Sequence, residues 1–254
     1  MRIYSSSYEL MSEMGRELNS YGQTVKPKTY QNKNIEGNED FVTKEIICQQ
    51  YCLTSLQDPS WLFFYSKSKG WADAEFQERI DTSSIINPGK AWELRKDLWE
   101  QFLVNGKFDY TYNERMLILP YTIQLLKSDS DTRKAVLPIF NGSGEDDTLY
   151  YHGNKRIPCS MYYDFLIREN GKGDIRENGK GEKVLHICYH QRSSDFVTHF
   201  GNDVYLAWRL MEYVAKEVGV KPGYLYHTID SLHAYQKDWD KLASSLRVFE
   251  ESII

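Results

Sequence analysis

The feature that most constrains the fold is an amphipathic helix predicted over residues 204–219, VYLAWRLMEYVAKEVG. Its apolar residues recur at helical spacing and form one stripe: Val204, Ala207, Leu210, Met211, Val214, Ala215 and Val218. Gly219 follows at the position where glycine commonly ends a helix. A stripe of this length needs another layer of structure to cover it, so the helix is expected to pack against a core.

The preceding part of the chain supplies a sheet for that layer. β-Branched and aromatic residues dominate TRKAVLPIF (132–140), SMYYDFLIR (160–168) and KVLHICYHQR (183–192), which predicts three strands. No stretch has the composition of a disordered linker. We therefore expect one α+β domain over residues 1–254, with a central mixed sheet flanked by helices.

Further helices are predicted in the first half of the chain. Residues 41–56 combine helix formers with mixed apolar spacing, and on a helix Cys48 and Cys52 would share one buried face. Residues 90–104 are expected to be helical, with a stripe made of Trp92, Leu98, Trp99 and Phe102. A helix is also expected over 113–127, interrupted near Pro120.

Composition excludes several classes of protein. The chain has 31 basic and 36 acidic residues and a net charge of −5, which argues against a general nucleic-acid binder. No apolar run approaches the roughly 20 residues of a membrane span, and the N-terminus lacks the apolar block of a signal peptide. The four cysteines lack zinc-site spacing, so a reduced, cytoplasmic protein without a metal is expected.

A short duplication separates the last two predicted strands. The heptapeptide IRENGKG occurs at 167–173 and again at 175–181. Because it is rich in glycine, asparagine and charge, we expect it to lengthen an exposed hairpin turn rather than to act in catalysis.

Three short segments contain the residue types that carry chemistry. They are RIPCSMYYDF around Cys159, QRSSD at 191–195, and SLHAY around His233. Cys159 is either a core cysteine or a nucleophile at a strand start beside a cleft. The QRSSD cluster is either a helix approach with a local Arg–Asp pair or an oxyanion site, because arginine and serine suit phosphate oxygens.

Taken together, the segments resemble the thymidylate synthase family. The family pattern is Pro-Cys, then Gln-Arg-Ser-x-Asp, then an asparagine at the start of a long helix, then His-x-Tyr. The corresponding residues here span about 130–240: Pro158, Cys159, Gln191, Arg192, Ser193, Asp195, Asp203, His233 and Tyr235. Upstream, NGKFDYTYNE is similar to the family segment with an active-site tyrosine, which would be Tyr112.

The resemblance implies a reaction in which the Cys159 thiolate adds to C6 of a pyrimidine nucleotide. C5 then attacks the one-carbon unit of 5,10-methylenetetrahydrofolate. Arg192 would lower the thiol pKa or bind the 5′-phosphate, with Ser193 and Gln191 sharing phosphate and ring contacts. His233 and Tyr235 would hold the ribose, and Asp195 would order folate or water.

The family also implies a homodimer through the sheet, because two arginines of the partner subunit help to bind each phosphate. The matching positions here are Arg133 and Lys134. Lysine offers a point charge in place of arginine's planar fork, so phosphate or ribose geometry is expected to differ.

The most informative departure from the family is Asp203, where thymidylate synthases have an asparagine that reads uracil. A carboxyl group suits the cytosine edge, since one oxygen accepts from the N4 amine and a protonated oxygen donates to N3. The resemblance is therefore closest to the cytidylate 5-hydroxymethylase branch, whose phage deoxycytidylate members and relatives acting on CMP carry the pair that appears here as Asn202 and Asp203. The alternative is that Asp203 only caps the helix that follows.

Two other departures concern the folate side. His199 replaces a family glycine, and only 19 residues follow Tyr235, whereas thymidylate synthases continue further. A missing C-terminal cover would let water attack the intermediate, as hydroxymethylation requires. The water-ordering glutamate is assigned to Glu75, with Glu78 as the second choice.

The sequence thus predicts a cytidylate 5-hydroxymethylase that uses 5,10-methylenetetrahydrofolate, with CMP slightly favoured over dCMP because Lys134 breaks the arginine pair. Two alternatives remain: a thymidylate synthase that methylates dUMP, and a nucleotide-binding homologue without catalysis.

Overall fold

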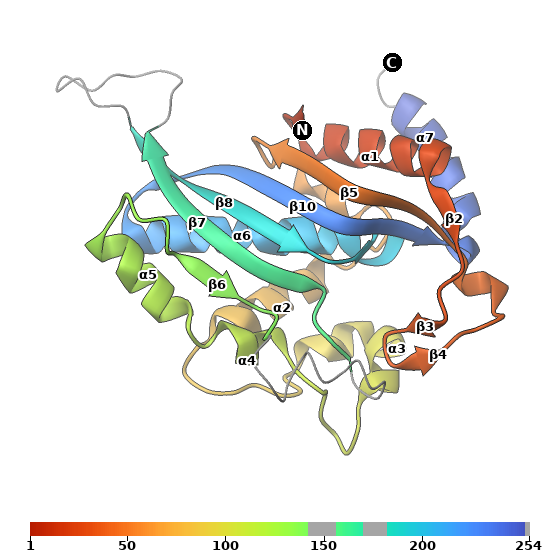
Figure 1. Ribbon diagram of the computed structural model, residues 1–254, viewed down its shortest axis with the longest axis horizontal. Coiled ribbons are helices and arrows are strands. Elements are labelled where there is room, and N and C mark those ends of the chain that lie inside the picture. Colours follow the sequence, from red (N-terminus) through yellow and green to blue (C-terminus); the bar gives the residue numbers. More distant parts are fainter. Residues whose placement is uncertain (142–155, 170–181, 252–254) are drawn as a thin grey trace.

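The computed structural model of the chain describes residues 1–141, 156–169 and 182–251, and a central sheet dominates it (Figure 1). Its strand order is β1-β5-β10-β8-β7-β6, with β2 added beside β5 and β9 beside β10. The strands are β1 (Arg2–Tyr4), β2 (Gln23–Val25), β5 (Thr43–Leu53), β6 (Val136–Pro138), β7 (Ser160–Glu169), β8 (Lys183–Gln191), β9 (Ser194–Asp195) and β10 (Lys221–Tyr235). β10 runs parallel to β8 and antiparallel to β5, so the sheet is mixed, as expected.

Helices lie behind this sheet and beside its edges (Figure 1). They are α1 (Ser7–Tyr21), α2 (Lys69–Ile80), α3 (Lys96–Trp99), α4 (Tyr112–Met116), α5 (Leu119–Ser128), α6 (Gly201–Val218) and α7 (Trp239–Glu251). Helix α6 runs behind the strands in Figure 1, and α1 and α7 pack together at one end. A separate small hairpin joins β3 (Thr29–Tyr30) to β4 (Lys33–Asn34). No helix in the described ranges is long and apolar enough to cross a membrane.

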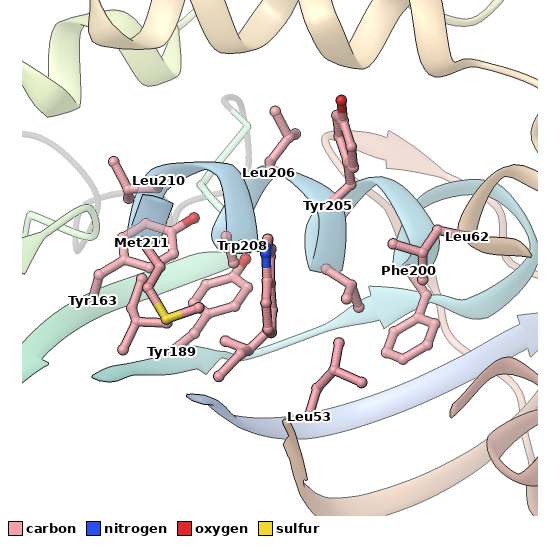
Figure 2. Packing of buried hydrophobic residues seen from close by; sticks show 14 of the residues in the cluster. Leu53, Leu62, Tyr163, Tyr189, Phe200, Tyr205, Leu206, Trp208, Leu210 and Met211 are labelled. Carbon is pink, nitrogen blue, oxygen red and sulfur yellow. The ribbon is translucent and has the colours of Figure 1, made fainter. Parts of the chain in front are cut away.

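The core lies between α6 and the sheet. Six of the seven predicted stripe residues of α6 are buried, and Val218 is half-buried at its end. Figure 2 shows Trp208 and Met211 pointing toward the tyrosines of β7 and β8, whereas Tyr205 and Leu206 point to the opposite side. Each fully buried large side chain stabilises the fold by roughly 1.5–3 kcal/mol, so this helix is a main source of stability. The predicted helix over 204–219 is confirmed, and its N-terminus begins three residues earlier.

The predicted strands over 160–168 and 183–192 are confirmed as β7 and β8, and within 132–140 only Val136–Pro138 forms a strand, β6. β7 and β8 pair antiparallel up to Glu169 and Lys183. The turn expected for the duplicated IRENGKG falls mainly in 170–181, outside the described residues. The helix predicted over 113–127 is also confirmed, as α4 and α5 with a break before Pro120.

The helix predicted over 41–56 is wrong, because this segment is the long strand β5. β5 pairs with β10 along its whole length, and Gln49, Tyr51 and Leu53 alternate toward the core. Pairing with β10 outweighs the helix propensity of its glutamate and glutamines, a common tertiary override. Cys48 is therefore exposed at a positive φ of 54°, while Cys52 is buried as expected.

The helix predicted over 90–104 is replaced by three short helical segments. They are Ala91–Arg95, α3 and Glu100–Phe102. The first begins where Glu78 accepts hydrogen bonds from the backbone N–H groups of Lys90 and Ala91. Trp92 and Trp99, which were predicted to share one helical stripe, both line the cavity described below.

A close backbone approach fixes the start of α6. A Cβ added at Gly201 would lie 1.7 Å from the carbonyl oxygen of Leu62. We predict that Gly201→Ala lowers the free energy of unfolding by about 2–3 kcal/mol, because backbone atoms must move to relieve the overlap. Gly70→Ala is the matched control, since nothing lies within 4 Å of its added Cβ in α2. The control should be neutral or stabilising by about 0.5–1 kcal/mol in urea denaturation, and equal effects would contradict this packing.

Candidate active site

A cavity of about 610 Å³ opens where β7 begins, β8 ends and α6 begins. Its walls also come from α2, α4 and the end of β10. Ten of the predicted site residues line it: Glu75, Tyr112, Cys159, Gln191, Arg192, Ser193, Asp195, Asp203, His233 and Tyr235. Arg133 and Lys134 do not line this cavity and are exposed ahead of β6.

Cys159 lies at the end of a loop, immediately before β7, and its side chain faces the cavity. The Arg192 Nη2 atom is 3.8 Å from Cys159 Sγ. Arg192 is held in place by donating to the carbonyls of Pro158 (2.9 Å) and Ile157 (3.1 Å). Burial raises the pKa of the Cys159 thiol, and the positive charge of Arg192 offsets part of that rise. The pKa of the thiol thus stays above its ordinary value, and Arg192 is the nearest cation that favours the thiolate.

Asp203 is in the first turn of α6, and its carboxyl group points into the cavity. Oδ2 accepts hydrogen bonds from Gln191 Nε2 (2.7 Å) and from Ser194 Oγ (2.8 Å). Helix α6 continues from the π-helical turn Phe196–Phe200, so Asp203 is not its cap. The capping alternative is therefore excluded by geometry.

Burial raises the pKa of Asp203 to about 6, although the two donors on Oδ2 act in the opposite direction. The carboxyl group therefore changes charge within the range in which enzymes work. Both donors are on the same oxygen, so one oxygen of the carboxyl group, Oδ1, remains for a ligand. This differs from the sequence-based expectation, which used both oxygens.

Glu75 and Glu78 differ in what holds them. Glu75 Oε1 accepts from Arg79 Nε at 2.8 Å, in an ion pair that is largely buried beside the cavity. Glu78 Oε1 instead accepts two backbone N–H bonds at the start of a helical turn. The guanidinium of Arg79 also stacks on the ring of Tyr112, 3.8 Å from its centroid. Glu75 is thus the glutamate whose carboxylate is free of a backbone-capping role.

Tyr112 is the first residue of α4, where Thr111 and Glu114 form a capping box. Its hydroxyl oxygen accepts from Ser160 Oγ at 3.2 Å and from Ser160 N at 3.4 Å. Burial raises the pKa of Tyr112, so the hydroxyl keeps its proton at neutral pH. That proton remains available to a ligand or water in the cavity.

β9 and β10 hold the remaining predicted residues. Asp195 pairs with His233 across these strands, and its Oδ1 accepts from the backbone of Val197 and Thr198. Burial lowers the pKa of His233, so its ring is neutral. The rings of His233 and Tyr235 are 5.1 Å apart and form one wall of the cavity. Asp195 thus has a structural role as a cap in addition to any role with a ligand.

Some cavity residues were not predicted from the sequence. The guanidinium of Arg156 stacks on Trp99 at 4.8 Å and on Phe102 at 4.6 Å, and its Nε is buried with no hydrogen-bond partner. His199 is close to Trp99, and burial lowers its pKa to about 4. The available signal for Arg156 was a basic residue three positions before Cys159. Asn202, by contrast, bonds to Ser68 and to the Thr198 carbonyl and does not line the cavity.

The raised pKa of Asp203 has a measurable effect on stability. Between about pH 4 and 6 the folded chain binds a proton that the unfolded chain releases, so wild-type stability falls as pH rises through this interval. We predict that, relative to Asp203→Asn, wild type loses about 2 kcal/mol of unfolding free energy between pH 4 and 7, at roughly 1.4 kcal/mol per pKa unit. Urea denaturation across this range measures the difference. Parallel curves would contradict the prediction, and Asp97→Asn, at an exposed position, is the control.

Comparison with known proteins adds a family to this geometry. The family model for thymidylate synthase matches residues 88–251. A putative thymidylate synthase of Methanosarcina mazei is 28% identical over 169 residues, covering 62% of this chain and 69% of the relative. A deoxyuridylate hydroxymethyltransferase of Bacillus phage SP01 is 30% identical over 190 residues, covering 74% of this chain and 42% of the relative.

Among solved structures, thermostable thymidylate synthase A from Bacillus subtilis matches 93% of this chain and 82% of its own, with a TM-score of 0.69. Sequence identity in that comparison is 13%, so it bears on the fold. The α+β class with a mixed central sheet is confirmed. The family model covers more than half of the chain, and this chain belongs to the thymidylate synthase family.

Proposed function

We propose that this chain is a cytidylate 5-hydroxymethylase, converting CMP or dCMP with 5,10-methylenetetrahydrofolate. The observation that carries the proposal is the carboxyl group of Asp203, which faces the same cavity as Cys159. The family uses one nucleophilic cysteine and a one-carbon carrier. Within that frame, the group facing the base determines which pyrimidine is accepted.

The charge state of Asp203 supports the choice of base. We place Oδ1 opposite the 4-substituent of the base. When ionised, Oδ1 is only an acceptor, so at that position it binds the N4 amine of cytosine and repels O4 of uracil. When protonated, Oδ1 can still accept from the N4 amine of cytosine, and it can instead donate its hydrogen to O4 of uracil. With a pKa of about 6, Asp203 is mainly ionised at neutral pH. Cytidylate therefore suits both states, and uridylate suits only the protonated state.

The other residues have the following proposed roles. The Cys159 thiolate forms a bond to C6 of the base, which transfers electron density to C5. Arg192 stabilises that thiolate and, through Nη1, binds the 5′-phosphate together with Ser193, while Gln191 contacts the ring. His233 and Tyr235 bind the ribose, and Asp195 orders water or carrier at this wall. Tyr112 supplies a neutral hydroxyl near C5, and Glu75 orders the attacking water.

The described residues fit the carrier. Trp92, Trp99 and Phe108 give the cavity flat apolar walls that suit a planar bicyclic ring. The guanidinium of Arg156, with its unpartnered Nε, provides positive charge for the carboxylates of a folate. When bound, 5,10-methylenetetrahydrofolate supplies the one-carbon unit that becomes the hydroxymethyl carbon.

A homodimer through the sheet is part of the proposal. Figure 1 views the sheet from the face opposite α6, and no described helix crosses in front of β7, β8 and β10. This face carries partly exposed apolar and aromatic side chains, namely Ile47, Tyr162, Leu166, Tyr224 and Tyr226. Burying them against a second copy would be favourable. Arg133 and Lys134 would then serve the phosphate site of the partner, which explains their exposure here.

A second candidate function is favoured by the names of two relatives. Those of Bacillus phage SP01 and Pseudomonas phage M6 are called deoxyuridylate hydroxymethyltransferases, the latter 30% identical over 127 residues. Hydroxymethylation of dUMP would need Asp203 to remain protonated. Methylation of dUMP is the other alternative, since several relatives are called putative thymidylate synthases.

The test is release of tritium from C5-labelled CMP, dCMP and dUMP, because C5–H is replaced by a C–C bond. We predict release from a cytidylate, dependent on the carrier, with a 5-hydroxymethyl product. No dihydrofolate should form, since water rather than hydride completes the reaction. Release from dUMP alone would favour the second candidate, and no release from any nucleotide would contradict catalysis.

Two sets of variants complete this experiment. Cys159→Ser should reduce tritium release by several orders of magnitude and still bind nucleotide. Cys188→Ser changes a half-buried cysteine on β8 away from the cavity and should stay active.

The dimer is tested by mixing two inactive variants, Arg133→Ala and Cys159→Ala. Activity should return after subunit exchange, because one site of the mixed dimer then carries neither change. Exchange without regained activity would exclude Arg133 from the partner's site.

A further inference from the structure

A chain of buried hydrogen bonds extends from the sheet to the base-reading carboxyl group. The Tyr51 hydroxyl is 2.8 Å from His227 Nδ1, and His227 Nε2 is 3.1 Å from Gln191 Oε1. Gln191 Nε2 then donates to Asp203 Oδ2 at 2.7 Å. Tyr51, His227 and Gln191 are each at most 1% exposed, and they come from β5, β10 and β8. Neither Tyr51 nor His227 lines the cavity.

The chain has only one consistent direction. An ionised carboxylate oxygen only accepts, so the NH₂ group of Gln191 must face Asp203 Oδ2. The carbonyl oxygen Oε1 of Gln191 therefore faces His227, whose Nε2 must carry a hydrogen. In a neutral imidazole Nδ1 is then an acceptor, and it receives the hydroxyl hydrogen of Tyr51. The ionised carboxyl group of Asp203 thus sets the direction of these hydrogen bonds, and the Tyr51 hydroxyl completes them by donating to Nδ1 of His227.

Packing keeps the members of the chain from rotating. The ring of Tyr189 stacks on His227 with centroids 4.3 Å apart, and Phe200 is nearly parallel at 6.4 Å. The rings of Tyr51 and His227 have centroids 5.3 Å apart and an interplanar angle of 64°. An imidazole flanked in this way cannot turn over to exchange its two nitrogens without disturbing the core.

The imidazole of His227 is neutral, as the chain requires. Burial lowers its pKa to about 3, and the nearby His190 acts in the same direction. The titratable groups facing it are Tyr51 from β5, Tyr189 and His190 from β8, and Asp203 of α6 through Gln191. His190 itself pairs with Asp230.

We propose that Tyr51 and His227 are positioning residues that fix the amide of Gln191 and thereby reserve Oδ1 of Asp203 for the base. The effect on base choice rests on the proposed function, in which Asp203 reads the pyrimidine. The direction of the hydrogen bonds does not rest on the proposed function. Without the Tyr51 hydroxyl, His227 can carry its hydrogen on Nδ1, and Gln191 can turn its carbonyl toward Asp203. A carbonyl facing Oδ2 favours a protonated carboxyl group, which accepts uracil.

Tyr51→Phe tests the proposal because it removes only the hydroxyl. The matched control is Tyr65→Phe, which removes another buried hydroxyl, bonded to Ser245 and away from the cavity. Nitrogen-15 NMR of labelled histidine distinguishes the tautomers, and only six histidines are present. The spectrum of His227→Gln assigns the signal. Calorimetry measures the dissociation constants of CMP and UMP at pH 8 for each protein.

We expect wild-type His227 to carry its hydrogen on Nε2 at pH 7–8, where Asp203 is ionised, and Tyr51→Phe to show both tautomers. The preference for CMP over UMP should fall about tenfold in Tyr51→Phe, equivalent to one lost hydrogen bond of roughly 1.4 kcal/mol, and remain unchanged in Tyr65→Phe. An Nδ1–H tautomer in wild type would overturn the proposal, as would an unchanged preference in Tyr51→Phe. A protein that binds neither nucleotide would contradict the proposed function. The tautomer of His227 would then still test the direction of the hydrogen bonds from Tyr51 to Asp203.

Discussion

The packing of α6 against β8 and β10 is the constraint on which the site depends. The buried stripe of α6 fixes the helix on the sheet, and the contact of Gly201 with the Leu62 backbone fixes where the helix starts. These two restraints hold Asp203 within reach of Gln191 at the end of β8. The same strand end carries Arg192, whose backbone N–H donates to the Cys159 carbonyl at 2.8 Å. Asp203, Arg192 and Cys159, the last proposed as nucleophile and the first as the group that reads the base, are thus positioned by one contact between layers.

Burial raises the pKa of two groups in this cavity, with different chemical consequences. It raises the pKa of the Cys159 thiol, which disfavours the nucleophilic thiolate, and Arg192 compensates in part. It also raises the pKa of Asp203 to about 6, which makes that carboxyl group responsive to a bound base. A nucleotide phosphate near Arg192 would weaken its help to the thiolate. The Arg156 guanidinium also favours the thiolate and gives the cavity a second cation.

Much of the architecture could be predicted from local pattern, and the exceptions have physical causes. Helix α6 and strands β7 and β8 were predictable because one-sided burial leaves a clear period in the sequence. β5 was not, because pairing with β10 outweighs its local helix propensity. The positions of Cys159, Gln191 and His233 around one cavity follow from ordered motifs. Their roles remain predictions.

The support behind these residues could not be predicted. Tyr51 and His227 are far apart in sequence and meet only because β5 and β10 are neighbours in the sheet. Ser194 was visible within the QRSSD cluster, but its bond to Asp203 depends on the start of α6. The consequence that Oδ2 is occupied and Oδ1 is free needs three-dimensional geometry. That asymmetry is the basis of the proposed choice of base.

The most direct test of this account is the ratio of kcat/KM for cytidylate to that for uridylate, measured for the ribonucleotides and deoxynucleotides in wild type and Asp203→Asn. The account predicts a cytosine preference in wild type at pH 8 that weakens at pH 5.5, where Asp203 is protonated. In Asp203→Asn, Gln191 and Ser194 would hold the amide oxygen, and the NH₂ group facing the cavity would favour O4 of uracil. The ratio should then fall by about 5- to 150-fold, for 1–3 kcal/mol per unpaired group. An unchanged ratio in the variant would contradict the central claim that Asp203 reads the base.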